Sequence, residues 1–180
     1  MPTPDTLITT MGLFWRADDV FWGRQNEKGS LLGMPADNKK GDPVDFREQG
    51  GIYVLYADYR IVYVGQTGVG AQKLFVRLRQ HRTDPLAGRW NQFSWFGVRR
   101  VLEKGKLGVE KLAIHAKLSL ALNHIEGVLI HASEPPLNGQ GGRFGENVGR
   151  YLQVRDDRLG APDRDLLVRL CNRSGVKIAG

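Results

Sequence analysis

Residues 51–81 decide the fold of this chain and read GIYVLYADYRIVYVGQTGVGAQKLFVRLRQH. Two short runs, residues 52–56 and 61–64, are rich in β-branched and aromatic residues, and a turn-like segment at residues 57–60 separates them. This order of run, turn and run predicts a β-hairpin. A glycine-rich segment at residues 65–70 then interrupts the pattern, as clustered glycines do.

A basic helix is expected next, from about residue 71 to residue 83. Leu74 and Leu78 lie four residues apart and would form an apolar stripe on it. Arg77 and His81, also four apart, would flank that stripe on one side. The spacing therefore predicts an arginine and a histidine beside the apolar face of one helix.

Two tripeptides in this stretch resemble the motif that gives the GIY-YIG nuclease superfamily its name. Gly-Ile-Tyr ends at Tyr53, and Tyr-Val-Gly begins at Tyr63 after nine intervening residues. Arg77 and His81 follow with the spacing that the family uses on its first helix. The valine in place of isoleucine is a mild change, whereas the segment between the second tripeptide and Arg77 is longer than in the compact members.

The resemblance continues to about residue 138. Glu126 resembles the metal-binding glutamate of the family, and Asn138, which follows two prolines and a leucine, resembles its later asparagine. The resemblance implies an α+β fold with a small antiparallel sheet of three or more strands flanked by helices. It also implies a nuclease-like core at residues 50–145, with extensions at residues 1–49 and 146–180.

The resemblance implies a magnesium-dependent (or manganese-dependent) endonuclease that hydrolyses phosphodiester bonds, most naturally in DNA. Glu126 would hold the metal, Arg77 would neutralise charge on the phosphoryl group, and Tyr63 would take a proton from water. Tyr53 and His81 would position the water or assist proton transfer. The implied site residues are Tyr53, Tyr63, Arg77, His81, Glu126 and Asn138.

This chemistry needs both phenols on one face of the hairpin. Opposite residues of an antiparallel pair point to the same face, so Tyr53 and Tyr63 share a face only when the connecting loop has an odd number of residues. A three-residue loop at residues 57–59 would place Tyr53 directly across from Tyr63. We therefore predict the three-residue loop.

Positive charge is concentrated in one region of the chain. The net charge is +7, and residues 73–117 carry 11 lysines or arginines against three acids, so the remainder is slightly acidic. A polyphosphate partner requires such a basic face, although a solvated basic surface is the plainer alternative. The expected nucleic-acid contacts are Lys73, Arg79, Arg82, Arg99 and Arg100.

Two other functions stay open. The chain could be a non-catalytic nucleic-acid-binding module on the same fold, or a nuclease directed at RNA. No apolar run approaches the roughly 20 residues that cross a bilayer, and the one cysteine, Cys171, cannot form an internal disulfide, so no membrane and a reducing cytoplasm are expected. The sequence indicates neither the target site nor the oligomeric state.

The remaining elements follow from weaker patterns. A third strand is expected from residue 92 to about residue 105, with Arg99 and Arg100 on it facing opposite ways. A helical region should run from residue 109 to about residue 132, and a last helix from residue 162 to about residue 172. Before the hairpin, residues 13–16 and 20–22 could pair, and residues 26–43 look like a long loop.

Overall fold

The computed structural model describes residues 7–37, 42–67, 72–109, 118–133 and 148–160 of the 180-residue chain. A single mixed sheet of seven strands dominates these residues, in the order β3-β2-β7-β1-β6-β4-β5. All neighbouring strands are antiparallel except β1 and β7, which are parallel. The strands are β1 (Thr10–Arg16), β2 (Leu32–Pro35), β3 (Val44–Asp45), β4 (Gly51–Ala57), β5 (Arg60–Thr67), β6 (Gln92–Gly97) and β7 (Gly149–Gln153).

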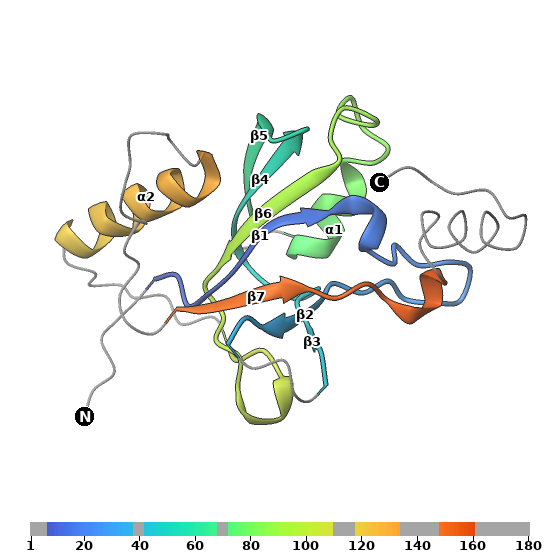
Figure 1. Ribbon diagram of the computed structural model, residues 1–180, viewed down its shortest axis with the longest axis horizontal. Helices are drawn as coiled ribbons and strands as arrows, with labels where there is room; N and C mark the ends of the chain where they lie inside the picture. Colours follow the sequence, from blue (N-terminus) through green and yellow to red (C-terminus); the bar gives the residue numbers. More distant parts are fainter. Residues whose placement is uncertain (1–6, 38–41, 68–71, 110–117, 134–147, 161–180) are drawn as a thin grey trace, which may run out of the picture.

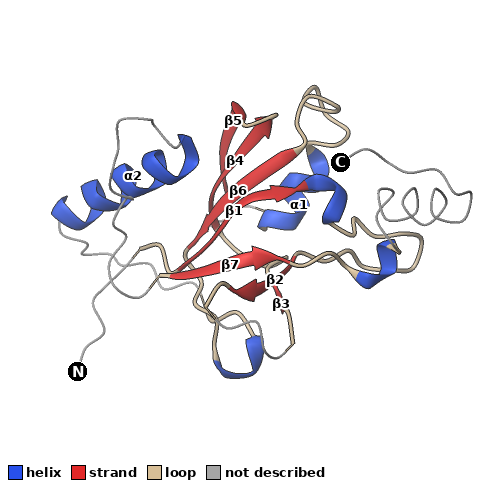
Figure 2. Ribbon diagram, in the orientation of Figure 1, coloured by secondary structure: helices blue, strands red, loops and turns tan. Residues whose placement is uncertain are grey.

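Two α-helices occur among the described residues, α1 (Leu74–Gln80) and α2 (Leu118–Ser133) (Figure 2). The α+β class expected from the sequence is confirmed, but the sheet is larger than the small antiparallel sheet that was expected and is mixed rather than antiparallel. Neither helix is long and apolar enough to cross a membrane.

The predicted hairpin is present as β4 and β5, but its turn is shorter than predicted. Asp58 and Tyr59 form a two-residue turn, and both have positive φ angles, 47° and 68°. Such a turn matches the twist of the flanking strands. The prediction of a three-residue loop is therefore wrong, and Tyr53 lies opposite Gly65 rather than opposite Tyr63.

A bulge in β5 nevertheless brings the two phenols to one face. The register passes from Tyr56 opposite Ile61 to Leu55 opposite Tyr63, so Val62 is an extra residue on its strand. One extra residue reverses the face of everything beyond it, which cancels the effect of the even turn. The shared face of Tyr53 and Tyr63 is thus confirmed, although the cause is a bulge.

The two faces of β4 are covered by different helices (Figure 1). Tyr53 and Leu55 belong to the core cluster that contains Leu74, Phe75 and Leu78 of α1. The alternate residues Val54 and Tyr56 belong to a second cluster with Val128 and Ala132 of α2. The hydroxyl of Tyr56 also donates to the carbonyl of Ala132 at 2.8 Å. Because successive strand residues point to opposite faces, α1 and α2 lie on opposite sides of the sheet.

The third strand ends earlier than the sequence suggested. β6 stops at Gly97, so Arg99 and Arg100 follow the strand and do not lie on it. After β6, the side chain of Gln49 satisfies the backbone of Arg99 in place of a neighbouring strand. It donates to the Arg99 carbonyl at 2.9 Å and accepts from the Arg99 amide at 2.9 Å. The polypeptide therefore leaves the sheet two residues after β6.

The N-terminal residues also differ from expectation. Residues 13–16 and 20–22 do not pair with each other, because β1 pairs with β6 and β7, and a short 3-10 turn (Ala17–Asp19) follows it. Residues 26–43 include β2 and so are not one long loop. The expected helix at residues 162–172 lies outside the described residues, as does the first part of the helical region expected from residue 109.

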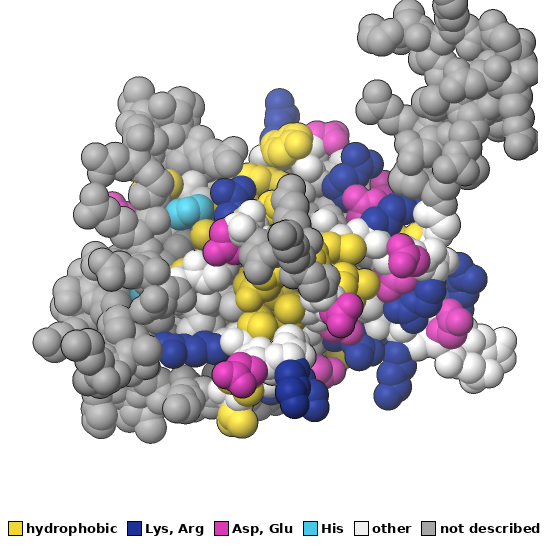
Figure 3. All heavy atoms as spheres, turned by 60° about the horizontal axis from the view of Figure 1, so that its bottom comes forward, with side chains coloured by type: hydrophobic (Ala, Val, Ile, Leu, Met, Phe, Trp, Pro, Cys, Tyr) yellow, Lys and Arg dark blue, Asp and Glu magenta, His cyan; other side chains and the backbone are white. Residues whose placement is uncertain are grey.

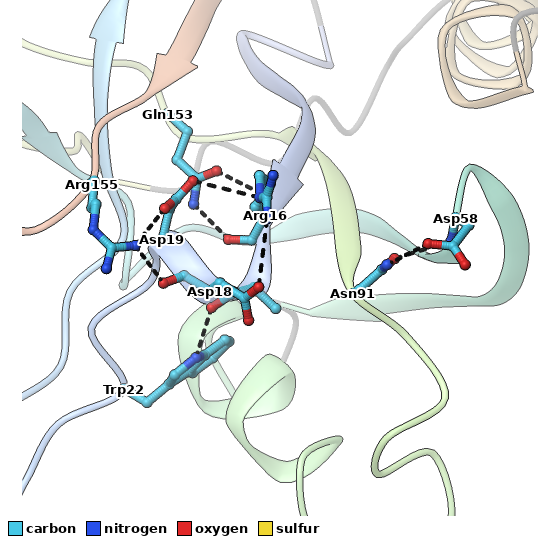
Figure 4. A network of polar contacts seen from close by, with 9 residues as sticks. Arg16, Asp18, Asp19, Trp22, Asp58, Asn91, Gln153 and Arg155 are labelled. Atoms are coloured by element: carbon cyan, nitrogen blue, oxygen red, sulfur yellow. Dashed lines mark hydrogen bonds and ion pairs between the residues drawn. The ribbon is translucent and has the colours of Figure 1, made fainter. Parts of the chain in front are cut away.

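Polar contacts fasten the end of β1 to the segment after β7 (Figure 4). Arg155 forms a 2.7 Å ion pair with Asp19 and donates to the Asp18 carbonyl at 3.0 Å. Gln153 accepts from the Arg16 amide at 2.6 Å and donates back to its carbonyl at 2.8 Å. These contacts hold the turn after β1 in place beside Trp22, whose ring stacks on Phe75 of α1.

Candidate active site

Four of the six expected site residues converge on the face of the hairpin that α1 covers. Tyr53 comes from β4, Tyr63 from β5 and Arg77 from α1, while His81 caps the end of α1. The ring centroids of Tyr53 and Tyr63 are 6.0 Å apart, and the His81 ring lies 5.7 Å from Tyr53 and 4.9 Å from Tyr63. Three aromatic rings therefore meet at one point.

A hydrogen-bonded chain runs through this cluster. The Tyr53 hydroxyl lies 2.7 Å from Nε2 of His81, and Nδ1 of the same ring lies 2.6 Å from Oδ2 of Asp84. Asp84 is in turn fixed by the Leu86 amide, which donates to Oδ1 at 2.8 Å. The chain connects a buried phenol to a partly exposed carboxylate through one imidazole.

Arg77 places a fixed positive charge beside both phenols. Its Nη1 donates to Oε1 of Gln80 at 2.9 Å, which steadies the guanidinium. Hydrogen bonding to Tyr53 and the proximity of Tyr63 raise the pKa of Arg77. Arginine is charged at any physiological pH in any case, so the site holds a permanent cation.

Burial dominates the acidity of Tyr53. The side chain is fully buried, and this desolvation raises the pKa of Tyr53 to about 12, although the Arg77 guanidinium opposes the rise. Tyr53 consequently keeps its proton at neutral pH. For Asp84, desolvation raises the pKa, but hydrogen bonds from the Leu86 amide and His81 outweigh it, so its pKa lies below the usual value.

Gly65 makes room for the buried phenol. A Cβ built on Gly65 would lie 2.4 Å from both Cζ and Oη of Tyr53, closer than any side chain can approach. Tyr53 and Gly65 are opposite each other in the hairpin, so the ring lies across the glycine backbone. The glycine that ends the second tripeptide is therefore required by the tyrosine that ends the first.

The site is open on one side. Tyr53 and His81 are buried, with 0% and 3% exposure, whereas Tyr63 and Arg77 are half-buried. A molecule that approaches from solvent meets Tyr63 and Arg77 before it reaches the other two side chains. The order of exposure places the cation and one phenol at the entrance, with Tyr53 and His81 behind them.

Glu126 lies apart from these four residues. It is exposed on α2, which packs on the opposite side of the sheet through Val128 and Ala132. The other implied residue, Asn138, lies outside the described residues. The structure thus brings together Tyr53, Tyr63, Arg77 and His81 but does not bring Glu126 to them.

Beside Tyr53, the described residues place one carboxylate in contact with the cluster, that of Asp84. Mg²⁺ is held by one or two carboxylates together with water and substrate phosphates. Asp84 is the carboxylate in contact with the cluster, but its oxygens already accept from His81 and Leu86. In the described part of the chain, no group of three or more His, Cys, Asp or Glu side chains could hold a metal ion.

The expected nucleic-acid contacts occupy different environments. Lys73 is half-buried just before α1, while Arg79 and Arg82 are exposed and lie over the rings of Phe75 and Trp22, at 5.9 and 4.8 Å. Arg99 is engaged internally, because its guanidinium donates to the carbonyls of Gly108 and Glu48, each at 2.6 Å.

Arg100, in contrast, is exposed. The face turned forward in Figure 3 carries Lys and Arg interspersed with Asp and Glu, so positive charge is not gathered there.

Sequence reasoning missed Asp84. It lies three residues after His81, a spacing that brings a carboxylate back toward a histidine at the end of a helix. In composition it is only one of three acids in a basic region. A search for a carboxylate within one helical turn of each candidate histidine could have found it.

Comparisons of this chain with models of known protein families, with curated proteins and with solved structures found no match. The resemblance to the GIY-YIG nucleases therefore rests on the motif residues themselves.

Proposed function

We propose that this chain is an endonuclease that hydrolyses phosphodiester bonds in DNA. The observation that carries the proposal is the convergence of Tyr53, Tyr63, Arg77 and His81, which come from two strands and the end of a helix. Two phenols, an imidazole and a guanidinium supply proton transfer and charge neutralisation, which are two of the needs of phosphodiester hydrolysis.

The hydrogen bond between Tyr53 and His81 supports a role for this pair in activating water. A phenol with a pKa of about 12 keeps its proton at neutral pH and is therefore not a base in the resting site. It can accept a proton from water only as its own proton passes to Nε2 of His81, 2.7 Å away. The hydroxide then attacks phosphorus, the bond to the leaving oxygen breaks, and that oxygen takes a proton from solvent. His81 loses its extra proton to solvent before the next turnover. Tyr53 is thus better suited to this role than Tyr63.

Arg77 and Tyr63 are suited to binding the scissile phosphate. Both are half-buried at the entrance, and the planar guanidinium can contact two phosphate oxygens at once. A preorganised donor of this kind is worth about 3–4 kcal/mol of barrier in other enzymes. Tyr63 could donate a hydrogen bond to a third oxygen, since its ring lies beside that of His81.

The expected dependence on magnesium rests on the resemblance. Bound to substrate phosphate, a divalent ion polarises the phosphoryl group and stabilises the leaving oxygen. The residue that the resemblance proposes as ligand is Glu126.

Incubation of the purified chain with supercoiled plasmid, with and without Mg²⁺ or Mn²⁺, tests the proposal. Nicked or linear product is expected, and Arg77→Lys should lower its rate by at least 100-fold while retaining the charge. Arg60→Lys is the matched control, because Arg60 is exposed on β5, outside the cluster and outside the expected nucleic-acid contacts. Binding of plasmid without cleavage under every condition would instead favour a non-catalytic module, and cleavage of RNA alone would favour an RNA-directed nuclease.

A further inference from the structure

We propose that Asp84 is a positioning residue that holds His81 in the tautomer able to accept the proton of Tyr53. The inference rests on the proposed function, because it assigns a role within the same site. It adds a residue that the motif resemblance does not supply. The observation that carries it is the continuous chain from the Asp84 carboxylate through both ring nitrogens of His81 to the Tyr53 hydroxyl.

Hydrogen bonds to the His81 backbone and burial of its side chain together fix the position of the ring. The indole of Trp90 donates to the His81 carbonyl at 3.0 Å, and the His81 amide donates to the Arg77 carbonyl at 3.2 Å. The ring is 3% exposed. With the ring so enclosed, Nδ1 faces Asp84 and Nε2 faces Tyr53.

The partners of His81 decide which nitrogen carries the proton. An ionised carboxylate only accepts hydrogen bonds, so Nδ1 must carry the hydrogen that reaches Oδ2 of Asp84 at 2.6 Å. In the neutral ring Nε2 is then a bare acceptor, and the Tyr53 hydroxyl donates to it. The other tautomer would set a donor against the phenol and leave no acceptor for its proton.

Asp84 is held in this geometry by the turn after α1. Its amide donates to the Gln80 carbonyl at 3.1 Å, and its Oδ1 accepts from the Leu86 amide at 2.8 Å, which leaves Oδ2 aimed at the imidazole. When the proton of Tyr53 passes to Nε2, the ring becomes an imidazolium. The carboxylate, 2.6 Å from Nδ1, stabilises that charge.

Asp84→Asn is the variant that tests this role. The amide oxygen can still accept from the Leu86 amide, so the turn can be kept, but an NH₂ group now faces Nδ1 and donates to it. His81 should then carry its hydrogen on Nε2. The matched control is Asp58→Asn, which removes a carboxylate from the turn between β4 and β5, where Asp58 pairs with Asn91 at 2.7 Å (Figure 4).

The first measurement does not involve cleavage. Nitrogen-15 spectra of the ring nitrogens, with the His81 signals assigned by their loss in His81→Gln, should show hydrogen on Nδ1 in the parent chain. In Asp84→Asn they should show hydrogen on Nε2, and in Asp58→Asn they should match the parent. A parent His81 protonated on Nε2 alone would overturn the proposal without reference to any variant.

The second measurement is plasmid cleavage. Asp84→Asn should lower kcat by about 10²–10⁴-fold, the contribution of one positioned acid or base, with KM little changed. Asp84→Glu should recover part of the rate. Parental kcat in Asp84→Asn would overturn the role in catalysis. If the parent chain cleaves nothing, the proposed function fails, but the ring spectra still decide whether Asp84 sets the tautomer.

Discussion

Tyr53 and His81, which are 28 residues apart in the chain, share a 2.7 Å hydrogen bond between the Tyr53 hydroxyl and Nε2 of His81. The bond joins the middle of a strand to the end of a helix and lies in the buried part of the site. It distinguishes the two tyrosines of the motif, because Tyr53 has the buried proton acceptor and Tyr63 is half-buried at the entrance.

Replacing each tyrosine by phenylalanine separates their roles. We expect Tyr53→Phe to lower plasmid cleavage by about 10²–10⁴-fold, since it removes the group that links water to His81. Tyr63→Phe should cost less, because it removes only a hydrogen bond to phosphate. Rates are compared at saturating metal, with thermal melts as a control for folding. The opposite order would return the proton-transfer role to Tyr63, the residue to which the resemblance assigns it.

The acidity of Tyr53 can be measured directly. In an alkaline titration followed by ultraviolet absorbance of phenolate, the component missing from Tyr53→Phe should have its midpoint near pH 12, above the usual tyrosine value of about 10. A missing component centred at about 10 would show that the ring is solvated.

The raised pKa of Tyr53 also predicts a stability change, and its sign is fixed. Below about pH 10 the phenol is neutral in both the folded and the unfolded chain, so the stability that its burial contributes is fully present. As the pH rises towards 12, the phenol ionises first in the unfolded chain. The free energy of unfolding therefore falls by about 2–3 kcal/mol. Between pH 9 and 11, the unfolding free energy of Tyr53→Phe, measured by denaturant unfolding, should fall less than that of the parent chain.

Gly65→Ala tests the packing of Tyr53 over the glycine. The added methyl group would meet the ring at 2.4 Å, so we expect a loss of about 1–3 kcal/mol in unfolding free energy and a large drop in cleavage. Gly108→Ala is the control, because a Cβ there has its nearest neighbour at 3.4 Å. Equal melting temperatures for the two variants would mean that the ring moves aside freely.

Arg99 and Arg100 should differ in what they contribute. Arg100→Ala is expected to weaken DNA binding and to reduce the slope of log affinity against log salt by about one, as for one lost phosphate contact. Arg99→Ala should mainly lower the melting temperature, because its guanidinium bonds two backbone carbonyls. Fluorescence anisotropy at several salt concentrations, together with melts, distinguishes the two. A salt-independent affinity would argue against nucleic acid as the partner.

The role that the resemblance implies for Glu126 stays a prediction. Glu126→Gln should abolish metal-dependent cleavage and leave the melting temperature unchanged, since the side chain is exposed and an amide is a poor ligand for magnesium. Cleavage rates are measured across a magnesium titration. Parental rates throughout would agree with the position of α2 on the opposite side of the sheet and would remove Glu126 from the reaction.

Local patterns predicted the part of the fold that local physics determines. The β-branched runs gave the hairpin, and the four-residue spacing of Leu74 and Leu78 gave α1, whose buried side is formed by those two residues and Phe75. The turn length was missed because the bulge at Val62 leaves no mark in composition. The turn is one residue shorter than predicted and the bulge adds one residue to β5. The two differences cancel, so Tyr53 and Tyr63 still share a face.

The rest of the fold could not be predicted because its partners are distant in sequence. β1 lies between β6 and β7, and the pairing of Thr10 with Gly149 depends on residues that no short window contains. Asp84 is within reach of local reasoning, because it follows His81 by three residues. At the site, the motif predicted the four residues that converge, but it did not predict Asp84, which bonds to His81.

The position of β7 sets an order on the assembly of the sheet. β7 lies between β1 and β2 in the sheet. β1 is the first described strand along the chain and β2 the second, whereas β7 is the last of the described strands. Contacts such as Trp15 Nε1 with the Tyr151 carbonyl span 136 residues. During synthesis, the β2–β3 ribbon cannot join the other strands until residues 149–153 have left the ribosome. Until then β1 is an open edge, and because the pairs that close it are distant in sequence, we expect its closure to be slow.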